Sequence, residues 1–249
     1  MPIIEITGMT LGAYGVGHLD DGRTVLVPKS APGDVLDVAI GSERRDYVIG
    51  HISEMLQAGA HRREPPCPFS GRCGGCDWQQ IEYSAQLEIK ARLIADELNR
   101  ALDCGLSPSG LIEPAPAELG YRSRVRFQIG PHGEIGFHET ASNRLVEIDG
   151  CLVADTAIKL PWSLAAALAG RCREIEVVAR GGEVQVLVAH LRKRPGAEEI
   201  KMARRIIEDD PSIRGVVLRS ADAREIIGSA IVSMEIEAGL EIEIEADLF

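Results

Sequence analysis

The chain has 249 residues, of which 45% are hydrophobic and 26% charged, and its formal net charge is −11. This length and apolar content are typical of two or three folded domains. No apolar run reaches the roughly 18 residues that a membrane helix needs, and no secretory signal opens the sequence, so we predict a cytoplasmic protein without a membrane partner. We also expect a monomer.

The negative charge argues at first sight against a polyanionic partner. However, residues 235–249 contain six acidic residues and no basic one. The basic residues of the remaining chain are clustered, so the net charge is a weak guide to the partner.

The first 58 residues predict a small all-β domain. Short apolar segments separated by turn signals lie at residues 3–6, 25–27, 35–40 and 47–52. Asp21-Gly22 is typical of a hairpin turn, and Pro32-Gly33-Asp34 of a second turn. Four or five short strands with glycines between them indicate an OB-like barrel over residues 1–58.

Barrels of this kind often bind single-stranded nucleic acid through a basic groove and stacking aromatic rings. Tyr14 lies in a glycine-rich stretch of the predicted barrel and is therefore a candidate RNA-binding residue. The alternative is that Tyr14 packs inside the barrel and that the glycines only form its corners.

Three cysteines lie within ten residues at Cys67, Cys73 and Cys76, with the spacing C-x5-C-x2-C. The glycines between them let the backbone turn tightly. Three thiolates this close repel one another unless a cation or a cluster holds them. We therefore predict a metal or iron–sulfur site, with Cys151 as the fourth ligand.

Other readings of these cysteines stay open. Three free thiols without a metal are unusual in a glycine-rich loop, and disulfides are typical of small secreted chains. Structural zinc usually takes two short cysteine knuckles, whereas three cysteines plus a distant fourth are commoner for [4Fe–4S] ligation. Cys104 and Cys172 are predicted to be non-ligands.

Residues 59–104 comprise this loop and a helix over 78–103. The helix is predicted from one apolar stripe with helical spacing, and we expect it to be core scaffold. The stripe consists of Leu87, Ala91, Ile94, Leu98 and Leu102.

Residues 121–129 predict a strand in which Arg122, Arg124 and Arg126 share one face and mostly apolar residues share the other. Three like charges on one face are unfavourable without an anionic partner. RNA phosphate is one such partner. The alternative is an acidic strand of the same chain, and the alternating glutamates of a terminal strand over 234–247 are suited to that role.

The rest of residues 105–249 predicts a mixed α+β domain. We expect helices over 153–170 and 196–209, and a hairpin of residues 174–179 and 183–189 turning at Gly181-Gly182. Further strands are expected at residues 134–138, 145–148, 215–219 and 226–231. The predicted fold class is therefore multi-domain: an all-β OB-like barrel, a cysteine loop with a helix, and an α+β domain.

Several segments, in the same order, resemble the N-terminal part of bacterial RNA uracil-5-methyltransferases that depend on S-adenosylmethionine. Residues 1–55 resemble a TRAM domain, through Gly15-Val16-Gly17, Asp21-Gly22-Arg23 and Pro32-Gly33-Asp34. The cysteine loop with Gly75-Cys76-Asp77-Trp78-Gln79, the segment 120–127, and the segment 146–151 with Cys151 are similar to further family motifs.

The resemblance implies a [4Fe–4S] cluster on Cys67, Cys73, Cys76 and Cys151 that supports folding and RNA binding. It implies an RNA substrate, such as a single-stranded loop of rRNA, held by the barrel and by Arg122, Arg124 and Arg126. The family continues into a Rossmann-like domain that binds S-adenosylmethionine and carries the catalytic residues. We find no such motif here, so we assign no catalytic residue and expect the N-terminal portion of a larger enzyme, or a truncated relative.

Two other functions stay open. The first is a non-catalytic RNA-binding module with a structural zinc or iron–sulfur site. The second is an electron-transfer protein, which predicts an accessible cluster and no affinity for RNA.

Overall fold

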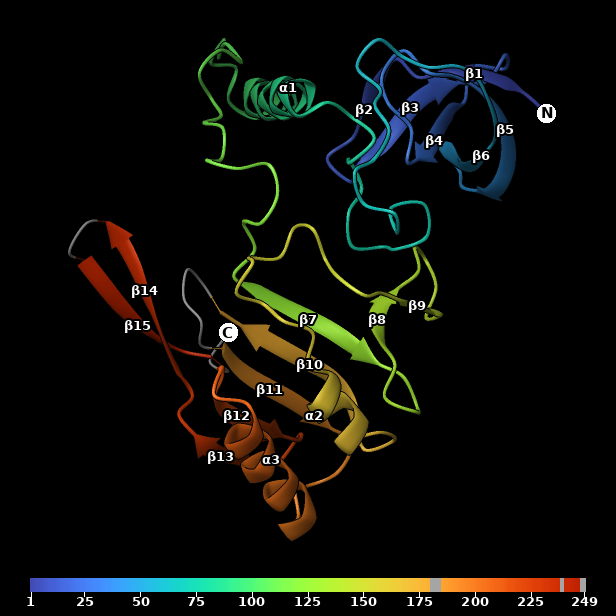
Figure 1. Cartoon of the computed structure of the whole chain (residues 1–249). Coiled ribbons are helices and arrows are strands. Elements are labelled where there is room, and N and C mark those ends of the chain that lie inside the picture. The colour runs from blue at the N-terminus through green and yellow to red at the C-terminus, as the bar shows by residue number, and fades with distance from the viewer. Residues whose placement is uncertain (180–184, 238–239, 247–249) are drawn as a thin grey trace. The chain divides into compact units, whose positions relative to one another are not determined.

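The computed structural model describes residues 1–179, 185–237 and 240–246. The chain forms two compact units, Met1–Pro116 and Ala117–Phe249 (Figure 1). The finer boundaries after residues 58 and 104 stay predictions. No helix among the described residues is both long enough and apolar enough to cross a membrane.

A curled six-stranded sheet forms the first part of unit Met1–Pro116, in the order β1-β5-β6-β4-β3-β2 (Figure 1). Alternating apolar residues point inward, and Ile4, Val25, Leu36 and Val48 are among the fully buried ones. The strands are β1 (Ile3–Glu5), β2 (Gly8–Met9), β3 (Tyr14–His18), β4 (Thr24–Pro28), β5 (Val35–Glu43) and β6 (Tyr47–Gln57). The predicted all-β character of this segment is confirmed.

Glycines let the strands of this sheet approach closely. A Cβ atom at Gly17 of β3 would lie 2.2 Å from Cγ2 of Ile4 in β1. A larger residue there would push β3 away from β1, so the glycine contributes to the curl of the sheet.

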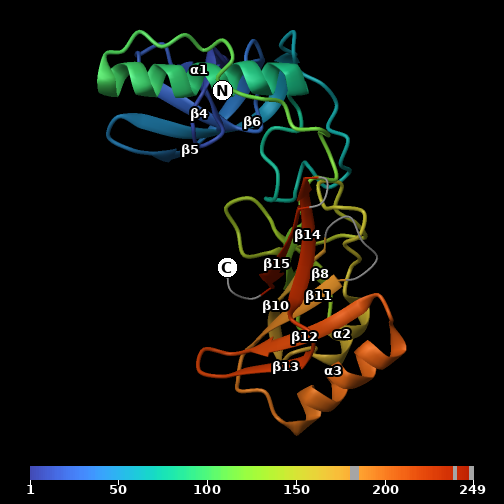
Figure 2. The same ribbon diagram turned by 90° about the vertical axis from the view of Figure 1, so that its left-hand side faces the viewer.

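Helix α1 (Tyr83–Leu102) follows the cysteine loop and is seen side-on in Figure 2. Its first turn packs on the curled sheet, where Ala85 and Ile81 join Met9 and Ala31 in one apolar cluster. The expectation that the whole apolar stripe is core was wrong. The second half of the stripe is exposed at Ile94 (39%), Leu98 (38%) and Leu102 (68%).

A seven-stranded sheet forms the core of unit Ala117–Phe249, in the order β13-β12-β11-β10-β7-β8-β9. The strands are β7 (Arg124–Ile129), β8 (Ile135–His138), β9 (Leu145–Glu147), β10 (Cys172–Val178), β11 (Gln185–Leu191), β12 (Ile213–Arg219) and β13 (Arg224–Gly228). The predicted β10–β11 hairpin is confirmed by its antiparallel pairing. Its predicted turn at Gly181-Gly182 lies outside the described residues.

Two layers cover this sheet. Helices α2 (Trp162–Ala167) and α3 (Ala197–Asp209) lie on one face (Figure 1). A hairpin of β14 (Ile231–Glu237) and β15 (Leu240–Glu245) packs its base on the other face, where Val232 and Ala246 meet Val178 and Val186. The hairpin then projects beyond the sheet in both views (Figures 1 and 2).

Two predicted elements differ from the structure. The helix expected over 153–170 is only α2, because Pro161 occupies its N-cap and disfavours helix before it, and Gly170 at φ 71° follows its end. The single terminal strand expected over 234–247 is instead the β14–β15 hairpin. The side chains of residues 234–242, whose shared face was also predicted, lie outside what the structure describes.

Candidate functional site

The cysteine loop is a series of tight turns between β6 and α1. The amides of Arg72 and Cys73 both donate to the carbonyl of Phe69, at 3.0 and 2.7 Å. The amide of Cys67 donates to Oε1 of Gln79 at 3.2 Å, which fastens the start of the loop to its end. Cys73 is buried, while Cys67 and Cys76 are partly exposed.

Polar side chains anchor this loop to the curled sheet. Nζ of Lys29 donates to the carbonyl of Cys76 and lies 3.5 Å from Asp77 Oδ1. Nε2 of the buried Gln80 donates to the carbonyl of Ser30 at 3.0 Å. The loop is therefore part of the same packed unit as the sheet.

A buried ion pair holds the segment that leads into the loop. Asp34 is fully buried, and its carboxylate accepts from Arg62 Nε at 3.0 and 3.1 Å and from the amides of Ala31 and Gly59. Sequence reasoning treated Arg62 as part of a linker and Asp34 only as a turn residue. Their separation of 28 residues hides the pair, although a charged residue at the end of a Pro-Gly-Asp turn was a partial signal.

The cysteine sulfurs of this loop are of the type that binds a metal ion or an iron–sulfur cluster. The amide of Gly75 donates to Sγ of Cys73 at 3.3 Å, and backbone donors to sulfur stabilise thiolate ligands. Within the described residues, no three His, Cys, Asp or Glu side chains converge as a metal site, and the cysteines form no disulfide. The predicted ligand role of Cys67, Cys73, Cys76 and Cys151 stays a prediction.

Cys151 belongs to the other unit, after β9. Its carbonyl accepts from the amide of Ala154 at 3.1 Å, and its side chain is partly exposed. Cys151 lines a cavity of about 500 Å³ together with Asp149, Lys159 and Trp162. Cys151 is therefore a partly exposed residue at the edge of a cavity.

The two cysteines predicted to be non-ligands differ from each other. Cys104 is exposed just after α1. Cys172 is buried in β10, where its thiol donates to the carbonyl of Glu174 at 3.0 Å. Burial raises the pKa of the Cys172 thiol to about 11, which keeps it protonated at neutral pH.

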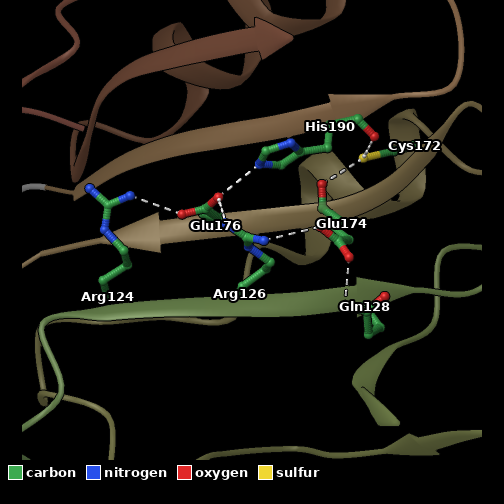
Figure 3. Close-up of polar contacts among 7 residues, drawn as sticks. All are labelled: Arg124, Arg126, Gln128, Cys172, Glu174, Glu176 and His190. Atoms are coloured by element: carbon green, nitrogen blue, oxygen red, sulfur yellow. Dashed lines mark hydrogen bonds and ion pairs between the residues drawn. The ribbon is translucent and has the colours of Figure 1, made fainter. Parts of the chain in front are cut away.

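The arginine strand forms an ion-pair cluster within the seven-stranded sheet (Figure 3). Nη1 of Arg124 lies 3.0 Å from Oε2 of Glu176, and Nη2 of Arg126 lies 2.7 Å from Oε1 of the same carboxylate. On the next strand, Nε2 of His190 lies 2.8 Å from Oε1 of Glu176. Gln128 and Arg126 both contact Glu174, at 3.0 and 3.8 Å.

The alternative of an acidic partner strand within the chain is thus the one observed, although the strand named for it was wrong. The arginines of β7 face the glutamates of β10, its neighbour in the sheet, where Arg126 is directly opposite Glu176. The predicted partner was the terminal segment 234–247. Both segments carry alternating glutamates, and the sequence does not show which of them pairs with β7.

Glu176 is the centre of this cluster. Burial by itself raises the pKa of this carboxyl, which is only 3% exposed. The hydrogen bond from His190 and the charges of Arg126, His190 and Arg124 outweigh burial and lower the pKa to about 2. Glu176 is therefore ionised at neutral pH and, together with Glu174, offsets the charges of the two arginines beside it.

Arg122 is not on this strand. β7 begins at Arg124, and Arg122 forms an isolated bridge to Ala154, with its amide donating to the carbonyl of Val153 at 2.9 Å. The prediction that all three arginines share one strand face was therefore wrong. Its half-buried guanidinium forms no ion pair within the described parts of the chain.

Tyr14 begins β3, where its amide donates to Thr10 Oγ1 at 3.1 Å. The side chain is partly exposed, and its ring lies over Gly12, where a Cβ atom would be 3.6 Å from Tyr14 Cδ2. The RNA-binding role of Tyr14 stays a prediction.

No model of a protein family matches the chain. Curated proteins do. An uncharacterized RNA methyltransferase of Gloeobacter violaceus is 36% identical over 159 residues, which are 62% of this chain and 35% of that protein. The 23S rRNA (uracil(1939)-C(5))-methyltransferase RlmD of Chromohalobacter salexigens is 29% identical over 98% of this chain and 56% of its own length.

A solved structure shares the fold. The tRNA (uracil-54, C5)-methyltransferase of Pyrococcus abyssi, in complex with S-adenosyl-L-homocysteine, superimposes with a TM-score of 0.67. The match covers 99% of this chain and 60% of that protein at 17% identity. The matched part of the chain thus spans about a third to somewhat over half of these relatives, and the chain is similar in sequence to RNA methyltransferases, one of them a uracil-C5 enzyme of 23S rRNA.

Proposed function

We propose that this chain is the RNA-recognition and iron–sulfur part of an S-adenosylmethionine-dependent RNA uracil-C5-methyltransferase that acts on rRNA. The observation that carries the proposal is the similarity to a 23S rRNA methyltransferase over 98% of the chain. The methyl transfer itself is assigned to no residue of this chain.

The curled sheet supports an RNA-binding role for the first unit. Its strands and turns fit a TRAM domain of the OB type, which binds single-stranded nucleic acid. Tyr14 is partly exposed on β3 and is a candidate for stacking on a base. Sequence-specific RNA recognition usually targets such unpaired bases.

The cysteine loop supports the cluster. Cys67, Cys73 and Cys76, together with Cys151, would hold a [4Fe–4S] cluster, and the Gly75 amide already donates to Cys73 Sγ. When bound, such a cluster would cross-link the loop and so support folding and RNA binding. Because Lys29 and Gln80 anchor the loop to the curled sheet, a cluster that fixes the loop would also fix its position on the sheet.

The three arginines divide into two kinds. Arg122 has no ion pair among the described residues, so it is free to meet a phosphate. Arg124 and Arg126 are paired with Glu176, so an RNA phosphate would have to compete with a buried carboxylate. Arg122 is therefore the best of the three for a direct phosphate contact.

RNA binding tests the proposal directly. We expect the chain to bind a fluorescein-labelled single-stranded 23S rRNA fragment more tightly than the same sequence in DNA. Each phosphate contact should contribute about 0.7 to the slope of log K against log salt. Fluorescence anisotropy at several salt concentrations measures both. Absence of RNA affinity would overturn the proposal and favour an electron-transfer protein.

The metal content tests the cluster. After anaerobic purification we expect about four irons and four sulfides per chain, lost in Cys73→Ser and Cys151→Ser. Cys104→Ser is the matched control, because that thiol is exposed and lies outside the loop. One zinc and no sulfide would point instead to an RNA-binding module with a structural zinc.

A further inference from the structure

An open cavity of about 570 Å³ lies beside the arginine cluster, on the face of the sheet that the helices leave uncovered. Residues of five separate segments line it, among them Gln128, His138, Asn143, Arg173, Glu174 and Arg192. Ligand sites usually fall between about 300 and 1,000 Å³. The cavity is therefore large enough for one nucleotide.

A β-bulge aims Arg173 into this cavity. The pairing of β10 with β11 shifts between Cys172 and Glu174, so Arg173 is the extra residue of β10. In a regular strand, Arg173 and Glu174 would point to opposite faces. Here both line the same cavity, and bulges commonly re-aim side chains in this way near functional sites.

Arg192 approaches from the neighbouring strand. Leu191 is buried toward the helices, so alternation turns Arg192 to the other face, the face of His190. The amide of Arg192 donates to the carbonyl of Arg171 at 2.8 Å, which fixes its backbone beside the bulge. Two guanidinium groups from adjacent strands are thus brought to one cavity.

Among the described side chains, these two arginines differ from their neighbours in having no acidic partner. Arg124 and Arg126 are paired with Glu176, and Arg171 with Glu198 and Glu199. Arg173 and Arg192 are exposed and form no ion pair with the described side chains, which are those of residues 1–179, 185–233 and 243–246. In a chain with a net charge of −11, unpaired arginines that share a cavity are a specific feature.

The carboxylate in the cavity wall is already occupied. Glu174 accepts from Gln128 Nε2 at 3.0 Å and lies 3.8 Å from Arg126 Nη1 (Figure 3). Its charge is therefore partly neutralised from the β7 side. A bound anion would meet Arg173 and Arg192 without facing an uncompensated carboxylate.

We propose that this cavity is an RNA phosphate site, in which Arg173 and Arg192 bind the phosphodiester backbone of the substrate RNA. The proposal rests on the proposed function and names the contact surface of unit Ala117–Phe249. Guanidinium forks match phosphate oxygens with paired donors, which favours arginine for this task. His138 and Asn143, which also line the cavity, add donors for sugar or phosphate oxygens.

In this arrangement Arg126 is a positioning residue. It contacts Glu174 and Glu176 and thereby lowers the negative charge beside the cavity, while Arg173 and Arg192 contact the RNA. On this face of the sheet, the arginines proposed to contact RNA are therefore Arg173 and Arg192 rather than Arg124 and Arg126.

The test is the salt dependence of RNA binding by the full chain. We expect Arg173→Gln/Arg192→Gln to bind a single-stranded 23S rRNA fragment at least tenfold more weakly, with a salt slope shallower by about 1.4, the value for two phosphates. The matched control is Lys201→Gln/Arg204→Gln, which removes the same charge from exposed positions of α3. The control should keep the wild-type slope.

Equal effects of the two double variants would overturn the proposal and leave the proposed function standing. Loss of RNA binding by the wild-type chain would instead overturn the proposed function. The variant Arg173→Lys/Arg192→Lys keeps both positive charges but loses the paired N–H donors of the guanidinium groups. It should therefore keep the wild-type salt slope and bind RNA more weakly. Inorganic phosphate could also raise the unfolding temperature of the chain while the chain shows no affinity for RNA. That result would identify a site for free anions and would overturn the proposal as well.

Discussion

At the residue scale, the cluster around Glu176 shows how a polar sheet face becomes stable. A buried carboxylate between two arginines and a histidine is stabilised only while every partner is in place. Removing one partner leaves an uncompensated charge in a poorly hydrated position. The cluster is therefore expected to be sensitive both to substitution and to pH.

We expect Glu176→Gln to lower the free energy of unfolding by about 3 kcal/mol at pH 7. The native pKa of about 2, against an ordinary value of 4.5, corresponds to a stabilisation of that order. Because the native pKa is lowered, this stabilisation is complete above pH 4.5 and is lost as the pH falls toward 2. Urea unfolding at pH 7 and pH 3 measures the difference.

Glu198→Gln is the matched control for this prediction. Glu198 also pairs with an arginine, Arg171, at 2.8 Å, but its side chain is 74% exposed. Exposed pairs contribute less than about 1 kcal/mol. A difference between Glu176→Gln and wild type that is the same at pH 7 and pH 3 would contradict the assignment of the stabilisation to the ionised carboxylate.

At the element scale, alternation in the sequence predicted which side chains share a face, and the structure confirms this in β7. Val125, Phe127 and Ile129 are buried, and Arg124, Arg126 and Gln128 are on the other face. The alternation of polar and apolar residues does not predict which strands pair with each other. Pairing depends on contacts between residues about 50 positions apart, such as Arg126 with Glu176, and on the bulge at Arg173.

The cysteine site shows the same limit. The spacing of Cys67, Cys73 and Cys76 identified the loop, since local chemistry is readable from local sequence. The anchors of the loop were missed, because Lys29, Asp34 and Gln80 are distant in sequence or resemble ordinary turn and surface residues. The helices were predicted less well than the strands, because apolar periodicity in α1 does not tell whether a face is covered.

The buried pair of Asp34 and Arg62 is expected to hold the cysteine loop against the curled sheet. Asp34→Asn removes the charge that accepts from Arg62 and should cost about 3 kcal/mol. In metal-free protein we expect faster alkylation of the buried Cys73, measured by mass spectrometry. The exposed Cys104 is an internal control whose rate should not change. An unchanged rate at Cys73 would show that the loop does not depend on this pair.

At the scale of the whole molecule, the proposed ligand set joins the two units. Cys67, Cys73 and Cys76 belong to Met1–Pro116, and Cys151 belongs to Ala117–Phe249. A cluster held by all four would therefore be a covalent link between the two units. The residues between α1 and the second unit are mostly exposed, so an insertion there should be tolerated.

A site-specific protease sequence inserted between Ser109 and Gly110 makes this link measurable. After cleavage of the cluster-loaded chain, we expect the two fragments to elute together in anaerobic size-exclusion chromatography. Cys151→Ser should let them separate, because the second unit then contributes no ligand, whereas Cys104→Ser should not. Fragments that stay together in Cys151→Ser would show that contacts other than the cluster hold the units, and Cys151 would lose its assigned role.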